Sequence, residues 1–455
     1  MSTTINVPAG PPTPPPGGYG VVLRNRKFLY LWFAQIFSLI AINSTLTMQL
    51  VLIERELQSA TAQVGIVLAF NLPAVFFSAL SGVIVDRYSK KWIMFISSAA
   101  RIGTQLVLVL LVLLLLGKKL DPLYFVPAMY IVTFITSATG QFFGPAEGGM
   151  IPFVVGRQGL LAGNSLFGIT LIAVNAIALL VLGPLAIKLL DYVPALFVAA
   201  LMYCGASLFV ALVPRDPVRR AGDEFHTTSF YRSLWSEFLA GWRYALSRPP
   251  ILLALTQVSL VGLMVSVMAA IGPGYARRVL GLEPEDAVFI FWPAGLGLII
   301  ASLFVGRFGA RFSRSTIAIT GLFTMGIGIA GLGIAPGLIT PSMSLTALVT
   351  WFSLLSGVGL ALIQIPAQTV IQEESSDEVR GRVLTVQFTA GNLIAVPLLL
   401  ALGALADVAG IPAITAVAGL VILIGGVLNL AYVITRRQYP PRAKKSEPSR
   451  EISPH

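Results

Sequence analysis

The chain has 455 residues, of which 56% are hydrophobic and only 11% are charged, and its mean hydropathy is +0.84. Soluble domains carry about 25% charged residues, so the composition excludes a soluble globular protein and indicates an integral membrane protein. The formal net charge of +11 would suit a nucleic acid, but the cations lie in short segments between apolar runs, as the positive-inside rule requires. We therefore expect a lipid bilayer around the chain and no nucleic acid.

Residue types that carry chemistry are scarce. Cys204 is the single cysteine, which excludes an intramolecular disulfide, and the two histidines, His226 and His455, lie outside the apolar runs. These counts argue against a haem or metal cluster within the membrane. The chain lacks the phosphate-binding pattern G-x-x-x-x-G-K-S/T and a nucleophile with a histidine. We expect no enzyme activity, no cofactor and no metal.

Twelve apolar runs, each long enough to cross a bilayer as a helix, follow a proline-rich tail (1–23) that we expect to be disordered. Six runs form an N-terminal half (24–213) and six form a C-terminal half (250–435), joined by a linker (214–249) with a predicted amphipathic helix. A basic tail (436–455) ends the chain. The sequence thus predicts an all-α integral membrane protein with twelve transmembrane helices. The expected spans are 28–53, 64–86, 92–116, 122–144, 163–187, 191–213, 250–272, 287–306, 315–336, 343–370, 380–406 and 411–435.

The distribution of cations predicts the orientation. With the N-terminus inside, about 24 Lys and Arg residues fall in cytoplasmic segments and about six in external ones, and such a bias sets topology when loops are short. We expect a multi-pass protein of the cell membrane with both termini in the cytoplasm.

A charged signature ends the second run. Residues 81–91 place a glycine, an acid and three cations at the end of a long apolar stretch, and a weakened copy occurs 224 residues later. A second pair of matching segments, Pro145-Ala146-Glu147 and Pro366-Ala367-Gln368, has an offset of 221 residues. An even number of spans separates the copies, so the two halves run parallel, with a substrate site expected between them. The first copy comprises Gly82, Asp86, Arg87, Lys90 and Lys91, and the second comprises Gly306, Arg311 and Arg314.

The acid of the signature calls for a partner. The helix dipole disfavours Asp86 at the C-terminal end of its span, and the N-terminus of another helix is a suitable partner. The eleventh span begins near residue 380 and offers free amides together with Arg380 or Arg382. The cations of the first copy would hold the loop at the anionic leaflet, or they are ordinary positive-inside residues. In the second copy Ala310 replaces the acid, so we expect such a contact between an acid and a helix N-terminus only at the first copy.

Polar residues recur within the spans. Each alone is typical of a hydrogen bond between helices, but together they predict a mostly uncharged cavity for an amphiphilic molecule. Arg101 is the single charge well inside a span, where it is costly unless it faces protein or water, and it belongs either to a substrate or proton-linked site or to a structural pairing. Glu147 is a candidate for a coupling proton if burial favours its neutral form, or it faces water. The candidate cavity residues are Asn43, Gln49, Asn71, Arg101, Gln141, Asn175, Gln257, Gln364, Gln387 and Asn392.

The spacing of residues 82–91 resembles the signature G-x-x-x-D-R-x-x-R/K-R/K of major facilitator transporters. Segments 142–147, 161–164, 241–244 and 377–382 look like the branch that contains macrolide-type, siderophore and multidrug exporters. The resemblance implies two parallel six-helix repeats, a cytoplasmic latch at the signature in the outward-facing state, and proton-driven export of a small organic molecule. The chain departs from the branch in two ways. It lacks a charge between about 122 and 144, and its glycine-rich motif in the fifth span is reduced to Gly183-Pro184.

Three functions follow as hypotheses. The first is a monomeric secondary transporter that exports a small amphiphilic molecule in exchange for protons. The second is a lysophospholipid flippase or an importer of a small solute. The third is a membrane sensor or scaffold that transports nothing, which would need neither a polar midplane nor the Asp86 latch.

Overall fold

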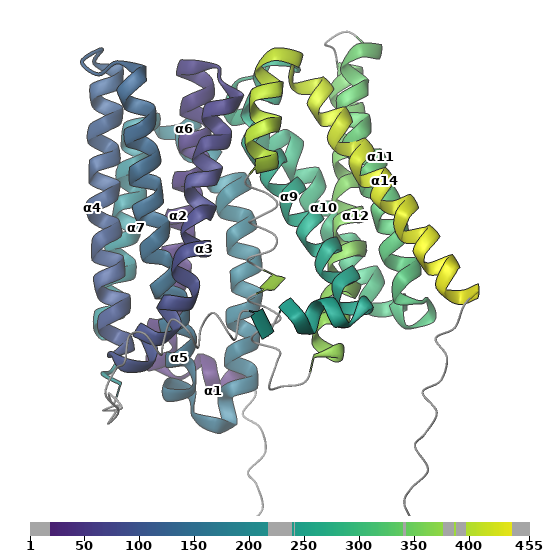
Figure 1. The fold of residues 1–455 in the computed structure, drawn as a ribbon. Helices are drawn as coiled ribbons and strands as arrows, with labels where there is room; N and C mark the ends of the chain where they lie inside the picture. Colours follow the sequence, from purple (N-terminus) through teal and green to yellow (C-terminus); the bar gives the residue numbers. More distant parts are fainter. Residues whose placement is uncertain are drawn as a thin grey trace, which may run out of the picture.

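The computed structural model describes residues 19–216, 239–240, 242–339, 343–375, 386–387 and 397–438. These residues form helices and the connections between them (Figure 1). The N-terminal half contains α1 (Tyr19–Leu23), α2 (Arg26–Leu57), α3 (Ala60–Arg87), α4 (Lys90–Leu116), α5 (Pro122–Ile177), the π-helical turn η1 (Ala178–Leu182), α6 (Gly183–Leu190) and α7 (Tyr192–Leu212). The C-terminal half contains α9 (Pro249–Arg278), the 3-10 turn η2 (Pro284–Ala287), α10 (Val288–Phe308), the 3-10 turn η3 (Gly309–Arg311), α11 (Arg314–Leu338), α12 (Met343–Glu374), an apolar helix Pro397–Ala409 and α14 (Ile411–Gln438).

The number and order of helices agree with the sequence analysis. Ten helices of the described residues are long and apolar enough to cross a membrane, and two shorter apolar helices, Ala162–Asn175 and Pro397–Ala409, lie where the fifth and eleventh spans were expected. The all-α membrane fold is confirmed. Residues 1–18 and most of the linker with its predicted amphipathic helix lie outside the described residues. Residues 19–23, predicted to be disordered, form α1, because Val22 is buried in the apolar cluster at this end of the bundle.

Helix α5 departs from the prediction. The sequence analysis ended the fourth span near residue 144, with a loop after it, whereas the helix continues to Gly156, whose φ of 65° and ψ of 178° break it. The extension forms because Phe143, Ala146 and Met150, spaced by three and four residues, bury one face of the helix in the core. Glycine has no Cβ and adopts a positive φ without steric strain, so Gly156 provides the turn that separates the two spans.

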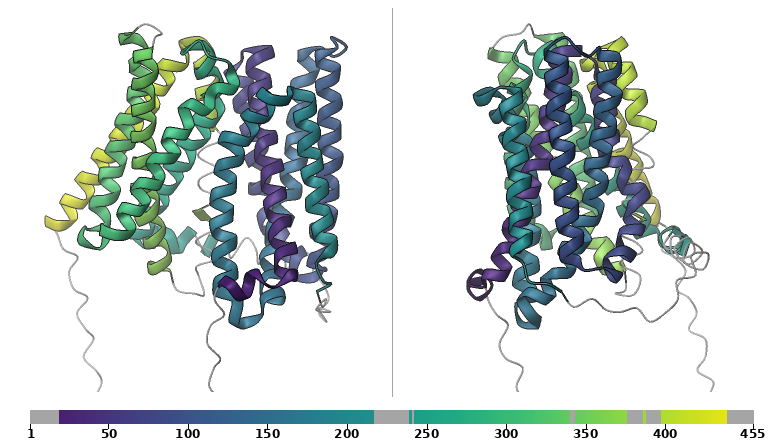
Figure 2. Two further views of the ribbon diagram at one scale, coloured as in Figure 1. Left: turned by 180° about the vertical axis from the view of Figure 1, so that it is seen from behind. Right: turned by 90° about the vertical axis from the view of Figure 1, so that its left-hand side faces the viewer.

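The chain forms two bundles. In the N-terminal half α2 packs on α5 and α7, α4 packs on the same two helices, and α3 packs on α5. In the C-terminal half α11 packs on α12 and α14, and α10 packs on α12. Between the halves, α3 contacts α9 and the helix Pro397–Ala409. Opposite views show that the bundles approach each other where α2 ends and α3 begins, which we call the closed end (Figures 1 and 2).

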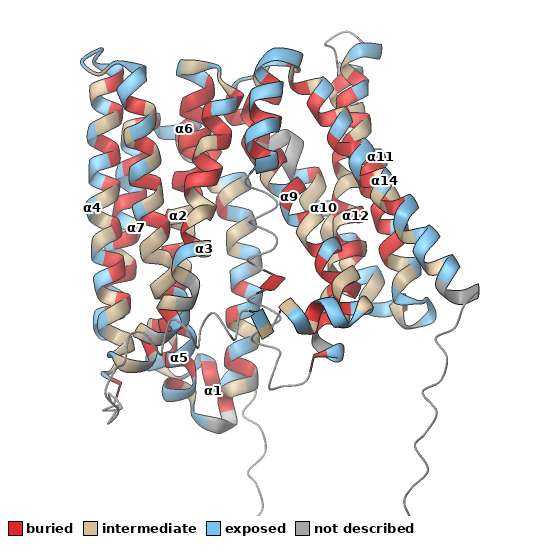
Figure 3. Ribbon diagram, viewed as in Figure 1, coloured by how far each residue is buried: buried red, intermediate tan, exposed pale blue. Residues whose placement is uncertain are grey.

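The bundles diverge toward the other end, which carries α1 and the last turns of α14 and which we call the open end (Figures 1 and 2). Buried residues concentrate where helices meet, and exposed residues lie along the outward faces of α4 and α14 (Figure 3). Many of these exposed residues are large and apolar, among them Ile96 and Leu110 on α4 and Leu428 on α14. An apolar outer surface is expected for helices whose solvent is the lipid bilayer.

Glycines allow the close packing of α11. A Cβ on Gly333 would overlap the backbone nitrogen of Ala416 on α14, whereas a Cβ on Gly337, one turn away on the same helix, has no described atom within 4 Å. Small residues at helix crossings let backbones approach closely within membranes.

We therefore expect Gly333→Ala to lower the free energy of unfolding by about 1–3 kcal/mol through overpacking. Gly337→Ala is the matched control and should be neutral or slightly stabilising, because alanine is the better helix former. Thermal unfolding of the two purified variants in detergent measures the difference. Equal melting temperatures would contradict the packing of α11 on α14.

Candidate functional site

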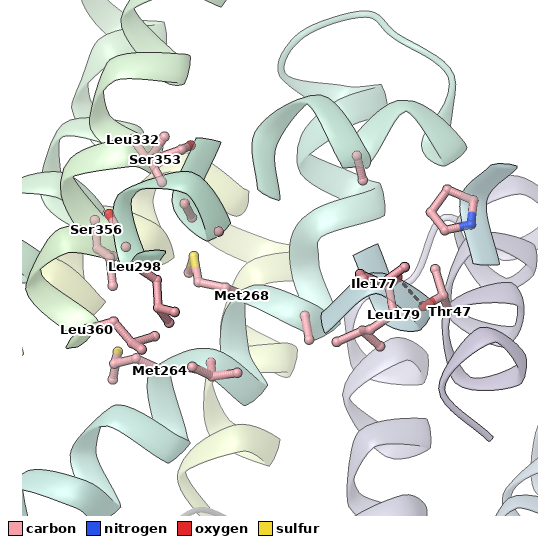
Figure 4. Close-up of a pocket in the computed structure, with 18 of the residues that line it drawn as sticks. Thr47, Ile177, Leu179, Met264, Met268, Leu298, Leu332, Ser353, Ser356 and Leu360 are labelled. Atoms are coloured by element: carbon pink, nitrogen blue, oxygen red, sulfur yellow. Dashed lines mark hydrogen bonds between the residues drawn. The ribbon is translucent and has the colours of Figure 1, made fainter. Parts of the chain in front are cut away.

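A cavity of about 600 Å³ lies between the two halves (Figure 4). It is lined by α2, α5, η1 and α6 of the N-terminal half and by α9, η2, α10, α11 and α12 of the C-terminal half, and the described residues of its lining include no charged and no aromatic residue. The cavity therefore provides an apolar surface with a few hydroxyl groups. The lining residues are Thr47, Leu50, Val51, Ile169, Ala173, Ile177, Leu179, Pro184, Met264, Val265, Met268, Ala269, Pro273, Ala287, Ala294, Gly295, Leu298, Ile299, Met325, Ile329, Leu332, Ser353, Ser356, Gly357 and Leu360.

The wall on the N-terminal side is shaped by the π-helical turn η1. Pro184 follows this turn and has no amide hydrogen to donate back along the helix. A Cβ on Gly183 would lie 2.9 Å from Thr47 Cβ, so the glycine permits α2 to approach. The Thr47 hydroxyl donates to the carbonyl oxygen of Leu179 at 2.7 Å (Figure 4). The Gly183-Pro184 pair, noted in the sequence, thus positions this wall of the cavity.

The wall on the C-terminal side comes from α9, α10, α11 and α12. Met264 and Met268 are one turn apart on α9, and Ser353 and Ser356 lie on α12. Figure 4 shows these residues opposite Ile177 and Leu179. Each half therefore contributes one face of the cavity.

An ion pair joins the halves at the closed end. The Glu54 carboxylate on α2 is fully buried, and Arg278 at the end of α9 donates to both of its oxygens, Nε to Oε1 at 2.8 Å and Nη2 to Oε2 at 2.7 Å. A Cβ on Gly274 would lie 3.1 Å from Glu54 Oε2, so this glycine leaves room for the carboxylate. Arg277 Nη1 donates to the carbonyl oxygens of Glu54 and Arg55, both at 3.0 Å. A bidentate pair is the strongest geometry for holding two elements together by charge.

Asp407, near the end of the helix Pro397–Ala409, caps the first turn of α3 from the opposite half. Its Oδ1 accepts from Ala60 N at 2.7 Å, and its Oδ2 accepts from Thr61 N at 3.0 Å and from Thr61 Oγ1 at 2.7 Å. The positive end of the helix dipole favours a carboxylate at this position. Arg278 Nη1 lies 3.6 Å from Asp407 Oδ1. One arginine thus reaches two carboxylates, and both contacts close the same end.

Two more ion pairs cross between the halves nearby. Lys188 Nζ lies 2.6 Å from Asp286 Oδ1, and Arg55 Nη1 lies 4.0 Å from Glu285 Oε1. The side chains of Lys188 and Arg55 are about half exposed. Exposed ion pairs contribute about 0–1 kcal/mol, so the buried Glu54 pair is the main electrostatic contact of the closed end.

At the open end, Asp216 caps α4 within the N-terminal half. Its carboxylate accepts from the Ser89 hydroxyl at 2.6 Å and from the amides of Lys90 at 2.9 Å and Lys91 at 3.3 Å. Burial alone would raise the pKa of Asp216, but these hydrogen bonds outweigh it and hold the pKa below its usual value. The loop of the charged signature is therefore fixed to the segment after α7.

The described residues of the predicted polar set lie away from the cavity lining, and several connect helices within one half. Asn43 Nδ2 donates to Asn175 Oδ1 at 2.5 Å between α2 and α5, and Gln257 Nε2 donates to Asn429 Oδ1 at 2.8 Å between α9 and α14. Gln49 Oε1 accepts from Thr133 Oγ1 at 3.2 Å, and Asn71 Nδ2 donates to Val67 O of its own helix. Gln141 is half-buried, Gln364 and Gln387 each have a buried Oε1 without a hydrogen-bond partner among the described residues, and Asn392 lies outside them. Their predicted contact with substrate stays a prediction.

Arg101 is buried inside the N-terminal bundle. It donates Nη1 to Ser38 Oγ at 2.6 Å and Nε to Thr139 Oγ1 at 3.2 Å, and its guanidinium lies 5.2 Å from the centre of the Phe143 ring. These contacts correspond to the structural pairing considered in the sequence analysis. Glu147 is also buried, and its Oε1 has no hydrogen-bond partner among the described residues. Whether either residue carries a proton stays a prediction.

The predicted gating residues that the structure describes lie at the open end. The Asp86 side chain, Arg380 and Arg382 lie outside the described part of the chain, so the predicted latch is untested. A Cβ on Gly82 or Gly306 has no described atom within 4 Å. The remaining cations have these positions: Arg87 is half-buried, Lys90 Nζ lies 3.9 Å from Asp216 Oδ2, Lys91 Nζ donates to Ala211 O at 2.6 Å, Arg311 lies over the Phe308 ring, and Arg314 pairs with both carboxylate oxygens of Glu373.

The sequence analysis did not single out Glu54, Arg278, Asp407, Asp216 or Ser353. A signal for the closed end was available, because Glu54 and Arg278 are opposite charges in the last turns of two spans that end on the same side. No comparable signal exists for Ser353, since serine in a span is usually bonded to its own helix.

The family follows from sequence comparison. The profile described as Major Facilitator Superfamily matches residues 31–398, and a second match covers 296–454. An uncharacterized MFS-type transporter of Bacillus subtilis (strain 168), YfiS, is 24% identical over 380 residues, which cover 80% of this chain and 83% of YfiS. A second protein described in the same way, YkuC of the same organism, is 25% identical over 138 residues, or 30% of each chain. The two-bundle fold and its central cavity are those of a membrane transporter, a class that is not enzymatic. The chain belongs to the Major Facilitator Superfamily.

Solved structures agree on the fold. The nucleoside transporter NupG superposes with a TM-score of 0.67 at 14% identity, covering 91% of this chain and 99% of NupG. A POT family transporter in complex with 5-aminolevulinic acid gives a TM-score of 0.69 at 10% identity, covering 90% and 96%. A bacterial homologue of the human lysosomal transporter Spinster, in an inward-facing and unoccupied conformation, gives 0.62 at 12% identity, covering 92% and 96%. Identities this low concern the fold and carry no information on substrate.

The buried ion pair predicts a loss of stability. We expect Glu54→Gln to lower the free energy of unfolding by about 1–3 kcal/mol, below the ~3–5 kcal/mol typical of a fully buried pair, because Arg278 keeps Asp407 and is partly exposed. Glu56→Gln, two residues away and exposed, is the matched control and should have no effect. The measurement is the melting temperature of the two purified variants. Equal values for both would contradict a stabilising ion pair between Glu54 and Arg278.

The Asp216 cap predicts a pH dependence. A carboxyl whose folded pKa is depressed contributes stability above its unfolded pKa and loses that contribution as the pH falls through the folded value. The difference in melting temperature between wild type and Asp216→Asn should therefore be constant from about pH 7 to pH 5 and shrink below about pH 4. A difference that already shrinks near pH 6 would contradict the cap.

Proposed function

We propose that this protein exports a small amphiphilic organic molecule from the cytoplasm in exchange for protons, by alternating access and as a monomer. The observation that carries the proposal is the apolar cavity between the halves, closed at one end by the Glu54–Arg278 pair and the Asp407 cap. A cavity that both halves line, with contacts between them at one end, is the arrangement that alternating access requires.

The direction rests on orientation. The excess of Lys and Arg in segments on the side of the N-terminus supports a cytoplasmic location for both termini, so the closed end would face the outside and the open end the cytoplasm. In this conformation the cavity would be accessible from the cytoplasm, as the loading step of an exporter requires. Opening of the external end would require separation of Glu54 from Arg278 and of Asp407 from α3. The predicted Asp86 latch would then hold the cytoplasmic side.

The lining supports a drug-like or macrolide-like substrate more than a siderophore-like one. Siderophores carry many polar and charged groups, and burying these without partners is costly. The apolar lining offers them few hydrogen bonds. A lysophospholipid would fit the cavity with its acyl chain, but its phosphate would find no cation among the described lining residues, which makes the flippase the weaker candidate.

Proton coupling is supported by one feature of the N-terminal half. Glu147 is a buried acid with one unpartnered carboxyl oxygen among the described residues, in the same bundle as the buried Arg101. A buried carboxyl without a fixed partner can alternate between its neutral and charged forms.

Export is tested by efflux from loaded cells. We expect cells with the wild-type protein to lose amphiphilic dyes and macrolides faster than control cells, and both a protonophore and Asp86→Asn to abolish the difference. Asp121→Asn, an exposed helix cap at the opposite end, is the matched control and should export normally.

The alternative outcomes separate the hypotheses. Efflux that survives the protonophore would remove proton coupling. Normal efflux by Asp86→Asn would remove the latch. No transport of any compound by a correctly inserted protein would overturn export of this substrate class and favour the flippase or the non-transporting sensor.

A further inference from the structure

We propose that Ser353 and three methionines that line the same cavity form the substrate-binding subsite, and that this subsite selects an electrically neutral lipophilic molecule with a hydrogen-bond acceptor. This inference deepens the proposed function, because it rests on the same cavity and names the class of molecule that the cavity takes. It depends on the unsatisfied hydroxyl of one side chain and on the composition of the surrounding wall.

Ser353 differs from the other hydroxyls of the lining. Thr47 donates to Leu179 O and Ser356 donates to Phe352 O at 2.8 Å, so their hydrogens are already used. Ser353 is buried, with 2% of its surface exposed, and its Oγ has no hydrogen-bond partner among the described residues. A buried polar group without a partner is costly. A ligand in the cavity that accepts a hydrogen bond from Ser353 would remove this cost.

The surrounding wall is soft and apolar. Met264 and Met268 on α9 line the same cavity as Ser353 (Figure 4), and so does Met325 on α11. Methionine side chains are unbranched and polarizable, and they adapt to ligands of different shape. The wall therefore favours lipophilic molecules and can accommodate ligands of different shapes.

Charge on the ligand is disfavoured by what the lining lacks. Among the described lining residues there is no acid to pair with a cation, no Lys or Arg to pair with an anion, and no aromatic ring for a cation–π contact. An ion that enters would lose its hydration without compensation. A neutral ligand pays no such cost, and Ser353 gives it one directional contact.

The test compares three ligands that share one saturated steroid skeleton: a ketone (androstanone), the hydrocarbon (androstane) and a protonated amine (aminoandrostane). Binding to the purified full-length protein in detergent is measured as a ligand-induced rise in melting temperature. We expect the wild type to bind the ketone more tightly than the hydrocarbon and to bind the amine weakest.

Two variants on the same helix assign the effect. Ser353→Ala should weaken ketone binding by about two- to tenfold, the effect of one neutral hydrogen bond, and leave hydrocarbon binding unchanged. Thr350→Ala, on the same helix but outside the cavity lining, should bind all three ligands like the wild type, because the Thr350 hydroxyl donates to Thr346 O within the helix. Because the Ser353 hydroxyl is unpartnered, Ser353→Ala without ligand should melt no lower than the wild type.

The results decide between the proposals. Equal ketone binding by Ser353→Ala and the wild type, or amine binding as tight as ketone binding, would overturn the subsite. Binding is measured without transport, so the two proposals can fail separately. If the protein prefers the ketone but shows no efflux, the export proposal is contradicted and the subsite is supported. Efflux by a protein that shows no ketone preference would support the export proposal and contradict the subsite.

Discussion

The arrangement of the two halves depends on one buried contact, the bidentate pair between Glu54 and Arg278. In a bilayer the apolar outer surfaces of the two bundles are solvated by lipid as well as by each other, so the hydrophobic effect gives little reason for them to associate. Charges and capping groups supply the specific contact. Because Glu54 is fully buried, separating the halves leaves its charge without its partner unless water or a proton replaces Arg278. A contact of this kind is strong when made and has a defined cost when broken, which suits an element with two discrete states.

The Asp407 cap adds a feature that the ion pair alone lacks. A carboxylate on the helix Pro397–Ala409 binds the N-terminus of α3, while the predicted latch would place Asp86, at the other end of α3, against the N-terminus of the same eleventh span. The predicted latch and the observed cap would then lie at opposite ends of the same pair of helices. A rocking motion that makes one would break the other, so the same physical interaction, an acid on a helix dipole, would close either side.

The polar residues of the spans were predicted to line the cavity, but several of them connect helices within one half. Amides such as Asn43, Asn175 and Gln257 join helices within one half, and Arg101 is held by hydroxyls inside the N-terminal bundle. Hydrogen bonds between helices stabilise each bundle as a rigid body. The apolar surface that remains is turned toward the cavity, where the proposed alternating access would move the halves past each other. Rigid halves and a weakly adhesive apolar interface are what alternating access requires.

The sequence by itself determined the class of the protein. Span length, hydropathy and the repeated signature follow from the thickness of a bilayer and from the unfavourable free energy of burying unpaired backbone groups in it, and each of these is local along the chain. The extension of α5 to Gly156 escaped prediction because a face of the helix at residues 143–150 is buried by residues distant in sequence. The same holds for the site. Only the tertiary structure decided that Glu54 meets Arg278, and that amides such as Asn43 and Gln257 are used between helices. It also decided that Ser353 has no hydrogen-bond partner among the described residues and lies in an apolar wall. Such pairings depend on which faces of which helices meet, and periodicity within one helix does not contain that information.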